Sequence, residues 1–291
     1  MRSKQLFLLV TALAILAACS TGKLTSSSKT NATTLENSGN YTEAMSAWNQ
    51  YFTQTPVEQT SGEDFANAAQ VAIKAGNTAQ AIGWFDQARY KNFASPEMYK
   101  SLAGIFKEED NFSKEMSALE FYTENYGNTD QDVSARLFSM YCEIGETEKA
   151  LSYWKLMDAS SRNQEANLLD YFQINKKLEN SAVCDSVSAV ILKINPDQTD
   201  ALDWMAKKYY RAGQDRYDSE MKKYEQNKTR KQYAVLLKEL DLVTADFKKA
   251  LPYLEKLWKQ NQTKEYASYF VNIYARFGDE QKVDYYKKHM Q

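Results

Sequence analysis

The stretch GNTAQAIGWF at residues 76–85 contains the pattern that decides the fold. Its Gly-Asn pair is followed five residues on by Ala81 and nine residues on by Phe85. Seven other copies, the last four of them weaker, start at Gly39, Gly145, Ala245, Asp110, Glu179, Gly213 and Gly278. In chain order the starts lie 37, 34, 35, 34, 34, 32 and 33 residues apart. A period near 34 residues predicts an array of helical repeats.

Each copy predicts a pair of packed helices. Before the Gly76 turn, apolar residues recur at helical spacing at Phe65, Ala68, Ala69 and Ala72. After it, they recur at Ala81, Phe85 and Ala88. Glycine readily ends a helix, and a turn this short requires the two helices to run antiparallel. Such a hairpin leaves an apolar face uncovered, so successive hairpins are expected to stack.

The pattern resembles the tetratricopeptide repeat (TPR) over about residues 29–291. That family places small residues at its eighth and twentieth positions, aromatic residues at its eleventh and proline at its thirty-second. The eighth position here is held by Ala103 and Ala206, and the eleventh by Phe106, Tyr141, Tyr209 and Tyr274. The twentieth is held by Ala44, Ala81, Ala150 and Ala250, and the thirty-second by Pro56 and Pro196. The resemblance implies an all-α, right-handed superhelical solenoid of about seven antiparallel helix hairpins.

The copy at Gly213 departs from this pattern. Its second-helix core slots hold Asp218 and Lys222, and the residues that follow, up to Lys231, are very polar and contain no Gly or Pro. This segment predicts a long exposed helix that can continue into residues 232–244. Regular repeat packing is therefore in doubt there.

Two single residues also depart from the pattern. Glu115 occupies the slot of the Asp110 copy that favours alanine. Pro252 falls inside a predicted second helix, where proline is expected to kink the helix or to shift its start.

The composition suits helices and limits the classes of partner. Of the 291 residues 43% are apolar, and only 10 are glycine and 4 proline. The formal net charge of −2 argues against a general nucleic-acid-binding protein. Residues 20–205 carry 15 Lys/Arg against 26 Asp/Glu, whereas residues 206–264 carry 15 against 8. The second segment predicts either a solvated mixed surface or a basic patch for an acidic partner or a membrane surface.

The first twenty residues resemble the signal of a bacterial lipoprotein. A basic head at residues 1–5 precedes an apolar run at residues 6–16, which is too short to span a bilayer. The sequence Leu-Ala-Ala-Cys that ends at Cys19 resembles a lipobox. The resemblance implies a signal peptide at residues 1–18, acylation of Cys19 and anchoring to a membrane. Residues 19–34 are expected to form a flexible tether, and residues 35–291 the repeat domain.

The same resemblance implies a location in the cell envelope. Residue 20 is serine rather than the aspartate that retains many such lipoproteins at the inner membrane, and no acidic run follows Cys19. We therefore expect an outer-membrane anchor that faces the periplasm. In an exported protein Cys142 and Cys184 could form a disulfide, but the repeat register puts them on helices that are not neighbours, so free thiols are expected.

The sequence lacks the residue sets of the common catalytic sites. Its one histidine, His289, is two residues from the last residue, so no triad can be built around a buried histidine. Neither a His/Cys metal spacing nor a glycine-rich phosphate loop is present. We predict a protein without enzymatic activity, cofactor or metal. A paired-carboxylate hydrolase stays open because acidic residues are plentiful, most densely at Glu108-Glu109-Asp110.

The resemblance also implies a concave groove lined by the first helices of the hairpins. The groove-facing positions hold Lys74, Lys100, Lys107, Lys176, Lys177, Lys207 and Arg211, together with Glu108, Glu143 and Asp203. Tyr210 is an aromatic residue that is expected to be exposed there. This groove is expected to be net basic and to bind an acidic or carboxylate-bearing segment of a partner. The alternative is that these cations only stabilise the C-terminal ends of the first helices.

These features predict a lipid-anchored TPR scaffold that binds another protein of the bacterial cell envelope and does not bind nucleic acid. Two alternatives stay open. One is a glycan- or peptidoglycan-binding lipoprotein that uses exposed aromatic residues such as Tyr210. The other is a hydrolase with a carboxylate pair.

Overall fold

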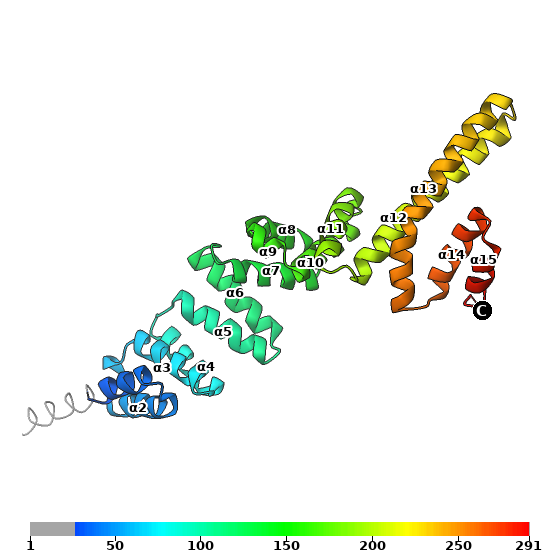
Figure 1. The fold of residues 1–291 in the computed structure, drawn as a ribbon. Helices are drawn as coiled ribbons and strands as arrows, with labels where there is room; N and C mark the ends of the chain where they lie inside the picture. Colours follow the sequence, from blue (N-terminus) through cyan, green and yellow to red (C-terminus); the bar gives the residue numbers. More distant parts are fainter. Residues whose placement is uncertain (1–26, 291) are drawn as a thin grey trace, which may run out of the picture. The chain divides into compact units, whose positions relative to one another are not determined.

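The computed structural model describes residues 27–290, and these residues are helical apart from short connections (Figure 1). The chain divides into two compact units between Leu137 and Phe138. The first unit contains a helix at residues 27–37, α2 (Tyr41–Gln54), the 3-10 turn η1 (Val57–Gln59), α3 (Gly62–Lys74), α4 (Thr78–Tyr90), α5 (Pro96–Glu108) and α6 (Phe112–Tyr126). Helix α7 (Gln131–Glu143) begins in the first unit and ends in the second.

The second unit continues the same arrangement of paired helices. Its elements are α8 (Thr147–Leu156), the short α9 (Ala159–Arg162), α10 (Glu165–Lys177), α11 (Ser181–Ile194), α12 (Thr199–Gln226), α13 (Arg230–Gln260), α14 (Lys264–Phe277) and α15 (Glu280–Lys287). Successive helices pair as hairpins, and α9 stands outside these pairs. The predicted all-α, TPR-like array of hairpins is therefore confirmed.

The turns of six hairpins lie where the pattern predicts them. The first residue of the copy has a left-handed backbone at Gly39, Gly76, Asp110, Gly145, Glu179 and Gly278. At Asp110 and Glu179 this conformation costs about 1–2 kcal/mol, because a side chain there crowds the following carbonyl. The pattern therefore identified the turns even where the residue was not glycine.

Burial explains the small and aromatic residues of the pattern. The slot five residues after each start is fully buried where it holds alanine, and Cys184 fills it with the same result. Phe85, nine residues after Gly76, is also fully buried. A small side chain lets the two helices approach, and the large ring fills the space beside it. Cys142, the other cysteine within residues 27–290, is half-buried, and both Cys142 and Cys184 are free, as the register predicts.

A buried ion pair accounts for the exception at Glu115. The side chain of Glu115 is 3% exposed, and its carboxylate accepts hydrogen bonds from Nε and Nη2 of Arg136 at 2.6 and 2.7 Å. Arg136 comes from α7, the first helix of the next hairpin. A charge can occupy the small-residue slot because its partner arrives from the neighbouring repeat.

The predicted turns at Gly213 and Ala245 are wrong. Helix α12 runs through Gly213, α13 runs through Ala245, and the chain turns between them at residues 227–229. The polar segment after Gly213 is helical as expected, but this turn separates it from residues 232–244. Figure 1 shows the two long helices side by side up to the yellow tip. The first and second helices of this repeat are thus longer than those of the other repeats. Residues 214–245, which form the added length of both helices and the turn that joins them, are called the helical extension.

Close packing explains the glycine that suggested a turn. A Cβ atom at Gly213 would lie 2.9 Å from Cε1 of Phe247, a ring that is fully buried. Gly213 therefore marks a point of close contact between α12 and α13. Four large apolar side chains of the extension are at least 40% exposed, namely Tyr233, Val235, Leu237 and Leu242.

Pro252 does not shift the start of its helix. Helix α13 begins at Arg230 and contains Pro252 in its interior. Figure 1 shows the axis of α13 bending in its orange C-terminal half, as expected for a residue that lacks an N–H donor.

The first helix begins inside the segment assigned to the tether. Residues 27–37 are helical and Ala32 is fully buried, so residues 27–34 belong to the first hairpin. Thr33 and Thr34 donate to the carbonyl oxygens four residues back, which makes hydroxyl-rich sequence compatible with a helix. The predicted signal peptide, Cys19 and the rest of the tether lie outside the described residues. Within residues 27–290, every helix is too short or too polar to cross a membrane.

Candidate functional site

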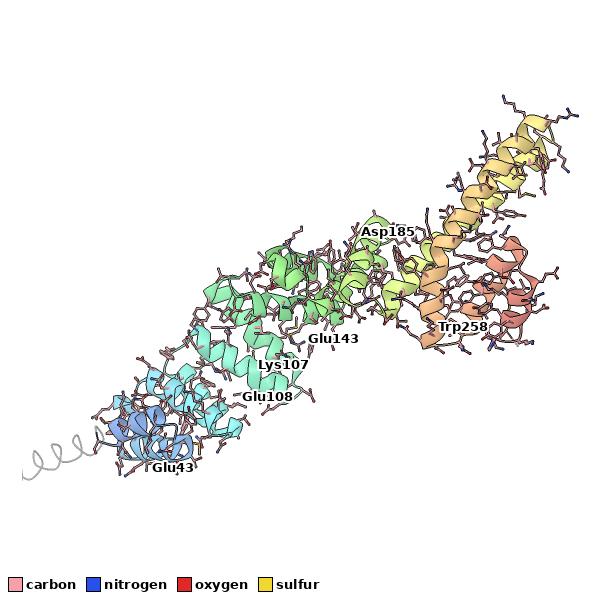
Figure 2. The ribbon with its side chains drawn as sticks, in the orientation of Figure 1. Glu43, Lys107, Glu108, Glu143, Asp185 and Trp258 are labelled. Atoms are coloured by element: carbon pink, nitrogen blue, oxygen red, sulfur yellow. The ribbon has the colours of Figure 1, made fainter. Side chains whose placement is uncertain are left out.

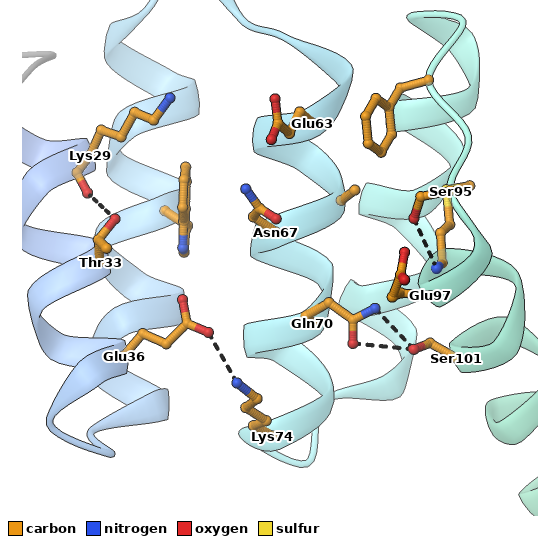
Figure 3. A pocket seen from close by; sticks show the side chains of 14 residues that line it. Lys29, Thr33, Glu36, Glu63, Asn67, Gln70, Lys74, Ser95, Glu97 and Ser101 are labelled. Atoms are coloured by element: carbon orange, nitrogen blue, oxygen red, sulfur yellow. Dashed lines mark hydrogen bonds and ion pairs between the residues drawn. The ribbon is translucent and has the colours of Figure 1, made fainter.

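A polar groove runs over the first helices of three hairpins in the first unit (Figure 3). This N-terminal groove has a volume of about 570 Å³. It is lined by residues 27–37, α3 and α5, together with Trp48 of α2 and the connection before α5. The first helices therefore line a groove in this unit, as the resemblance to TPR proteins implies.

One face of α3 forms the floor of the N-terminal groove. Glu63, Asn67, Gln70 and Lys74 follow one another at spacings of four, three and four residues, which places them on one side of a helix. The opposite side of α3 carries the buried alanines that pack against α4. Gln70 Nε2 donates to Ser101 Oγ at 2.9 Å and thereby connects α3 to α5. The groove is thus built on packed helices.

Both lysines of the N-terminal groove are paired with carboxylates. Lys74 Nζ lies 3.0 Å from Glu36 Oε1, and Lys29 Nζ lies 2.5 Å from Asp64 Oδ1. Tyr51 also donates its hydroxyl to Asp64, at 3.0 Å. Burial alone would raise the pKa of Asp64, but the hydrogen bonds from Lys29 and Tyr51 outweigh it and the pKa is lowered. Burial and the neighbouring Asp64 raise the pKa of Tyr51 to about 12.

Within the part of the chain that the structure describes, two carboxylates and two neutral groups of the N-terminal groove have no partner. Within residues 27–290, Glu63 and Glu97 form no ion pair, and the exposed amide of Asn67 forms no hydrogen bond. Figure 3 shows Glu63 and Asn67 on α3 and Glu97 on α5 across the groove. Trp48 is only 2% exposed, and its Nε1 has no hydrogen-bond acceptor.

The second unit contains a groove of its own. Cations outnumber carboxylates in its lining, whereas carboxylates outnumber cations in the N-terminal groove. This C-terminal groove has a volume of about 440 Å³ and lies between α10, α11 and α12. Lys207 Nζ lies 2.9 Å from both Asp203 Oδ1 and Glu265 Oε1, and these hydrogen bonds raise its pKa although burial opposes them. Lys176 and Arg211 also line the groove, and neither is ion-paired within residues 27–290.

The predicted groove residues are therefore divided between the two units. Lys74 lies in the N-terminal groove, and Lys176, Lys207 and Arg211 lie in the C-terminal groove. Lys177 lines a small hollow of about 270 Å³.

The other predicted residues lie outside both grooves. Lys100 pairs with Asp130 at 2.6 Å. Lys107 is exposed near the end of α5, next to Glu108 (Figure 2). The hydroxyl of Tyr210 accepts a hydrogen bond from Asn272 Nδ2 at 2.9 Å, and its ring lies 4.5 Å from that of Tyr269. These contacts hold the Tyr210 ring against its neighbours.

The hollow beside Lys177 contains an unusual carboxyl group. Glu143, Asp170 and Cys142 line it as well. Burial raises the pKa of Asp170, and nearby Glu143 raises it further, while a hydrogen bond to Ser139 opposes both. Burial likewise raises the pKa of the Cys142 thiol to about 12, which disfavours the reactive thiolate. Among residues 27–290 no group of three or more His, Cys, Asp or Glu side chains is placed to hold a metal ion.

Sequence reasoning missed the residues that set the charge of the N-terminal groove. Lys29 and Glu36 lie on a helix that was assigned in part to the tether. Trp48 lies on a second helix, whereas only first helices were expected to line the groove. The helical spacing of Ser28, Ala32 and Leu35 was the available signal for the first of these.

Comparisons with known proteins agree with the fold. No protein-family model and no curated protein sequence matches the chain. Among solved structures, the C-terminal part of a TPR repeat-containing protein from Cytophaga hutchinsonii is 14% identical, with a TM-score of 0.50 over 90% of this chain and 93% of that one.

Two further structures are similar at lower scores. A TPR protein from Parabacteroides merdae is 10% identical, with a TM-score of 0.47 and 91% of each chain covered. YrrB, described as a TPR protein with an unusual peptide-binding site, is 14% identical, with a TM-score of 0.48 over 60% of this chain and 89% of that one. The first similarity supports the TPR-like fold of this chain.

Proposed function

We propose that this protein is a non-enzymatic scaffold, anchored in the bacterial cell envelope by a lipid on Cys19, that binds another envelope protein through its N-terminal groove. The sequence pattern at residues 1–20 supports the anchor and the outer-membrane location. Two or more acyl chains hold a protein firmly to a bilayer, so a lipidated Cys19 needs no membrane-spanning helix.

The observation that carries the binding role is the groove itself. First helices from three successive hairpins present polar side chains to one continuous hollow, and their apolar sides are occupied by the repeat core. Such a surface fits a segment of another chain, because helices fixed by packing need not be ordered on binding. The unpaired amide of Asn67 can both donate to and accept from a peptide backbone.

Site-specific photo-crosslinking tests the binding role. A benzoylphenylalanine at position 67 of the full chain, expressed in its native host, is expected to crosslink one envelope protein, identified by mass spectrometry and recovered in the reciprocal experiment. The matched control is the same probe at Gln87, which is exposed on α4 outside the groove. Identical products at both positions, or none at position 67, would reject the groove as the binding site.

The lipid anchor is tested separately. Cys19→Ser is expected to abolish incorporation of an alkyne-labelled fatty acid and to release the protein from the membrane fraction. Unchanged labelling would show that Cys19 is not the acylated residue. Retention on peptidoglycan or polysaccharide, lost on Tyr210→Ala, would instead favour the glycan-binding alternative.

A further inference from the structure

We propose that the N-terminal groove selects an extended segment of its partner that carries lysine or arginine. This inference rests on the proposed function and specifies the class of ligand. It differs from the acidic partner expected from the sequence, because the pairing of the charges in the groove decides which of them are available.

The cations of the N-terminal groove are already neutralised within the protein. Lys29 is bound to Asp64 and Lys74 to Glu36, so an acidic ligand would have to compete with internal carboxylates for both. Glu63 and Glu97 have no cationic partner within residues 27–290. An approaching segment therefore meets uncompensated negative charge, which attracts lysine or arginine and repels carboxylates.

The positions of the two carboxylates suit a single chain lying across the helices. Glu63 is in the first turn of α3 and Glu97 is in the first turn of α5. The N-terminal end of a helix is a favourable place for an acidic side chain, so neither residue needs a cationic side chain beside it. Figure 3 shows Glu63 and Asn67 on α3 and Glu97 on the neighbouring α5. Two basic side chains of one segment can each pair with one of these carboxylates.

An independent observation points to a ligand that supplies hydrogen-bond acceptors. Trp48 is 98% buried in the wall of the groove, and its Nε1–H has no acceptor among residues 27–290. A buried donor without a partner is unfavourable, and proteins rarely leave one unsatisfied. A backbone carbonyl of the ligand that reaches the indole supplies the missing acceptor. Asn67, also without a partner, can bind the next peptide group.

The unpaired carboxylates and the indole N–H together exclude simpler ligands. A metal ion or a small cation would not satisfy an indole N–H, because that group donates a hydrogen bond. A polyanion would satisfy the indole but would face Glu63 and Glu97. An extended peptide with basic side chains supplies carbonyl acceptors and positive charge from one molecule.

Fluorescence anisotropy on the full chain in detergent micelles tests the proposal. The probes are three labelled ten-residue peptides of the same length, in which four positions are Lys, Ala or Glu. The Lys peptide is expected to bind most tightly, and its affinity should fall as salt is raised. Glu63→Gln together with Glu97→Gln should weaken its binding by about threefold to tenfold, as expected for two exposed charge pairs.

Two matched variants keep the result specific. Glu43→Gln removes one exposed carboxylate from α2, outside the groove, and should leave binding of the Lys peptide unchanged (Figure 2). Trp48→Phe keeps a buried ring but removes the N–H, so it should weaken all peptides about equally while the circular dichroism spectrum and the melting temperature are retained.

The outcomes separate this inference from the proposed function. Tighter binding of the Glu peptide, or equal weakening by Glu43→Gln and by the double variant, would overturn the selection of basic segments. In that case crosslinking from position 67 to an envelope protein would still support the scaffold. If position 67 crosslinks nothing, the proposed function fails, whichever peptide binds.

Discussion

The hairpins α3–α4 and α12–α13 carry glycine at the same position of the repeat pattern, yet Gly76 and Gly213 meet different requirements. Gly76 has a φ of +75°, and an added methyl group would meet no atom within 4 Å. Gly213 lies in a helix, and the same methyl group would lie 2.9 Å from the Phe247 ring. The backbone requires the first glycine and packing requires the second. The pattern therefore records where a small residue is needed, but not whether the chain turns there.

The largest effect is expected at the crossing of the long hairpin. Phe247→Ala removes a fully buried ring and should lower the free energy of unfolding by about 3–5 kcal/mol, measured by urea denaturation. Leu237→Ala, at a residue of the helical extension that is 47% exposed, should change it by less than about 0.5 kcal/mol. Similar losses for both variants would show that the extension is as tightly packed as the repeat core.

The next effect compares two glycines inside helices, one packed against a ring and one in open space. Gly213→Ala should destabilise the protein by about 1–3 kcal/mol, because its methyl group overpacks against Phe247. Gly83→Ala in α4, where no atom lies within 4 Å, should stabilise it by about 0.5–1 kcal/mol through helix propensity. Phe247→Leu added to Gly213→Ala should recover part of the loss. Stabilisation by Gly213→Ala alone would contradict the packing role.

A smaller effect is expected at the regular turn. Gly76→Ala should cost about 1–2 kcal/mol, because an L-residue is strained at positive φ even in open space. Gly76→Asn should cost less, because asparagine tolerates this conformation. Thermal unfolding of the two variants measures the difference. Equal melting temperatures would show that the left-handed backbone conformation does not set the cost.

The smallest effect concerns how the regular hairpin responds to pH. The pKa of Asp64 is lowered by hydrogen bonds from Lys29 and Tyr51, against the effect of burial. Its contribution is present above the unfolded pKa and is lost as the pH falls through the lowered folded value. The difference in stability between the wild type and Asp64→Asn, about 1 kcal/mol at pH 7, should therefore shrink below about pH 4. Asp86→Asn, at an exposed residue of α4, serves as the control.

The fold could be predicted largely from the period, because each turn imposes a backbone conformation that few residues adopt. Six starts of the pattern have that conformation, including Asp110 and Glu179. The exposed helix after Gly213 was predicted, but its turn at residues 227–229 was not, because the extension is close to one period long and Gly213 resembles a turn glycine. Only the contact with Phe247, 34 residues further along the chain, reveals its role.

The N-terminal groove was predicted only in part. The register placed Lys74 on the correct side of α3, since that position follows from helical periodicity alone. The charge of the groove depends on which ion pairs form between helices, and Glu36 lies 38 residues before Lys74. Such pairing is a property of the packed array, and a single first helix does not contain it.

The close approach of Gly213 and Phe247 also has a consequence for how this protein can change. The chain leaves the core of the α12–α13 hairpin beyond Tyr217 and returns to it at Val243, so the outer part of the extension can vary in length. Removing or adding seven residues in both helices would alter the reach of the hairpin by about 10 Å and keep the same faces in contact. The repeats on either side would keep their spacing. The length of the helical extension can therefore change while the packing of the neighbouring repeats stays the same.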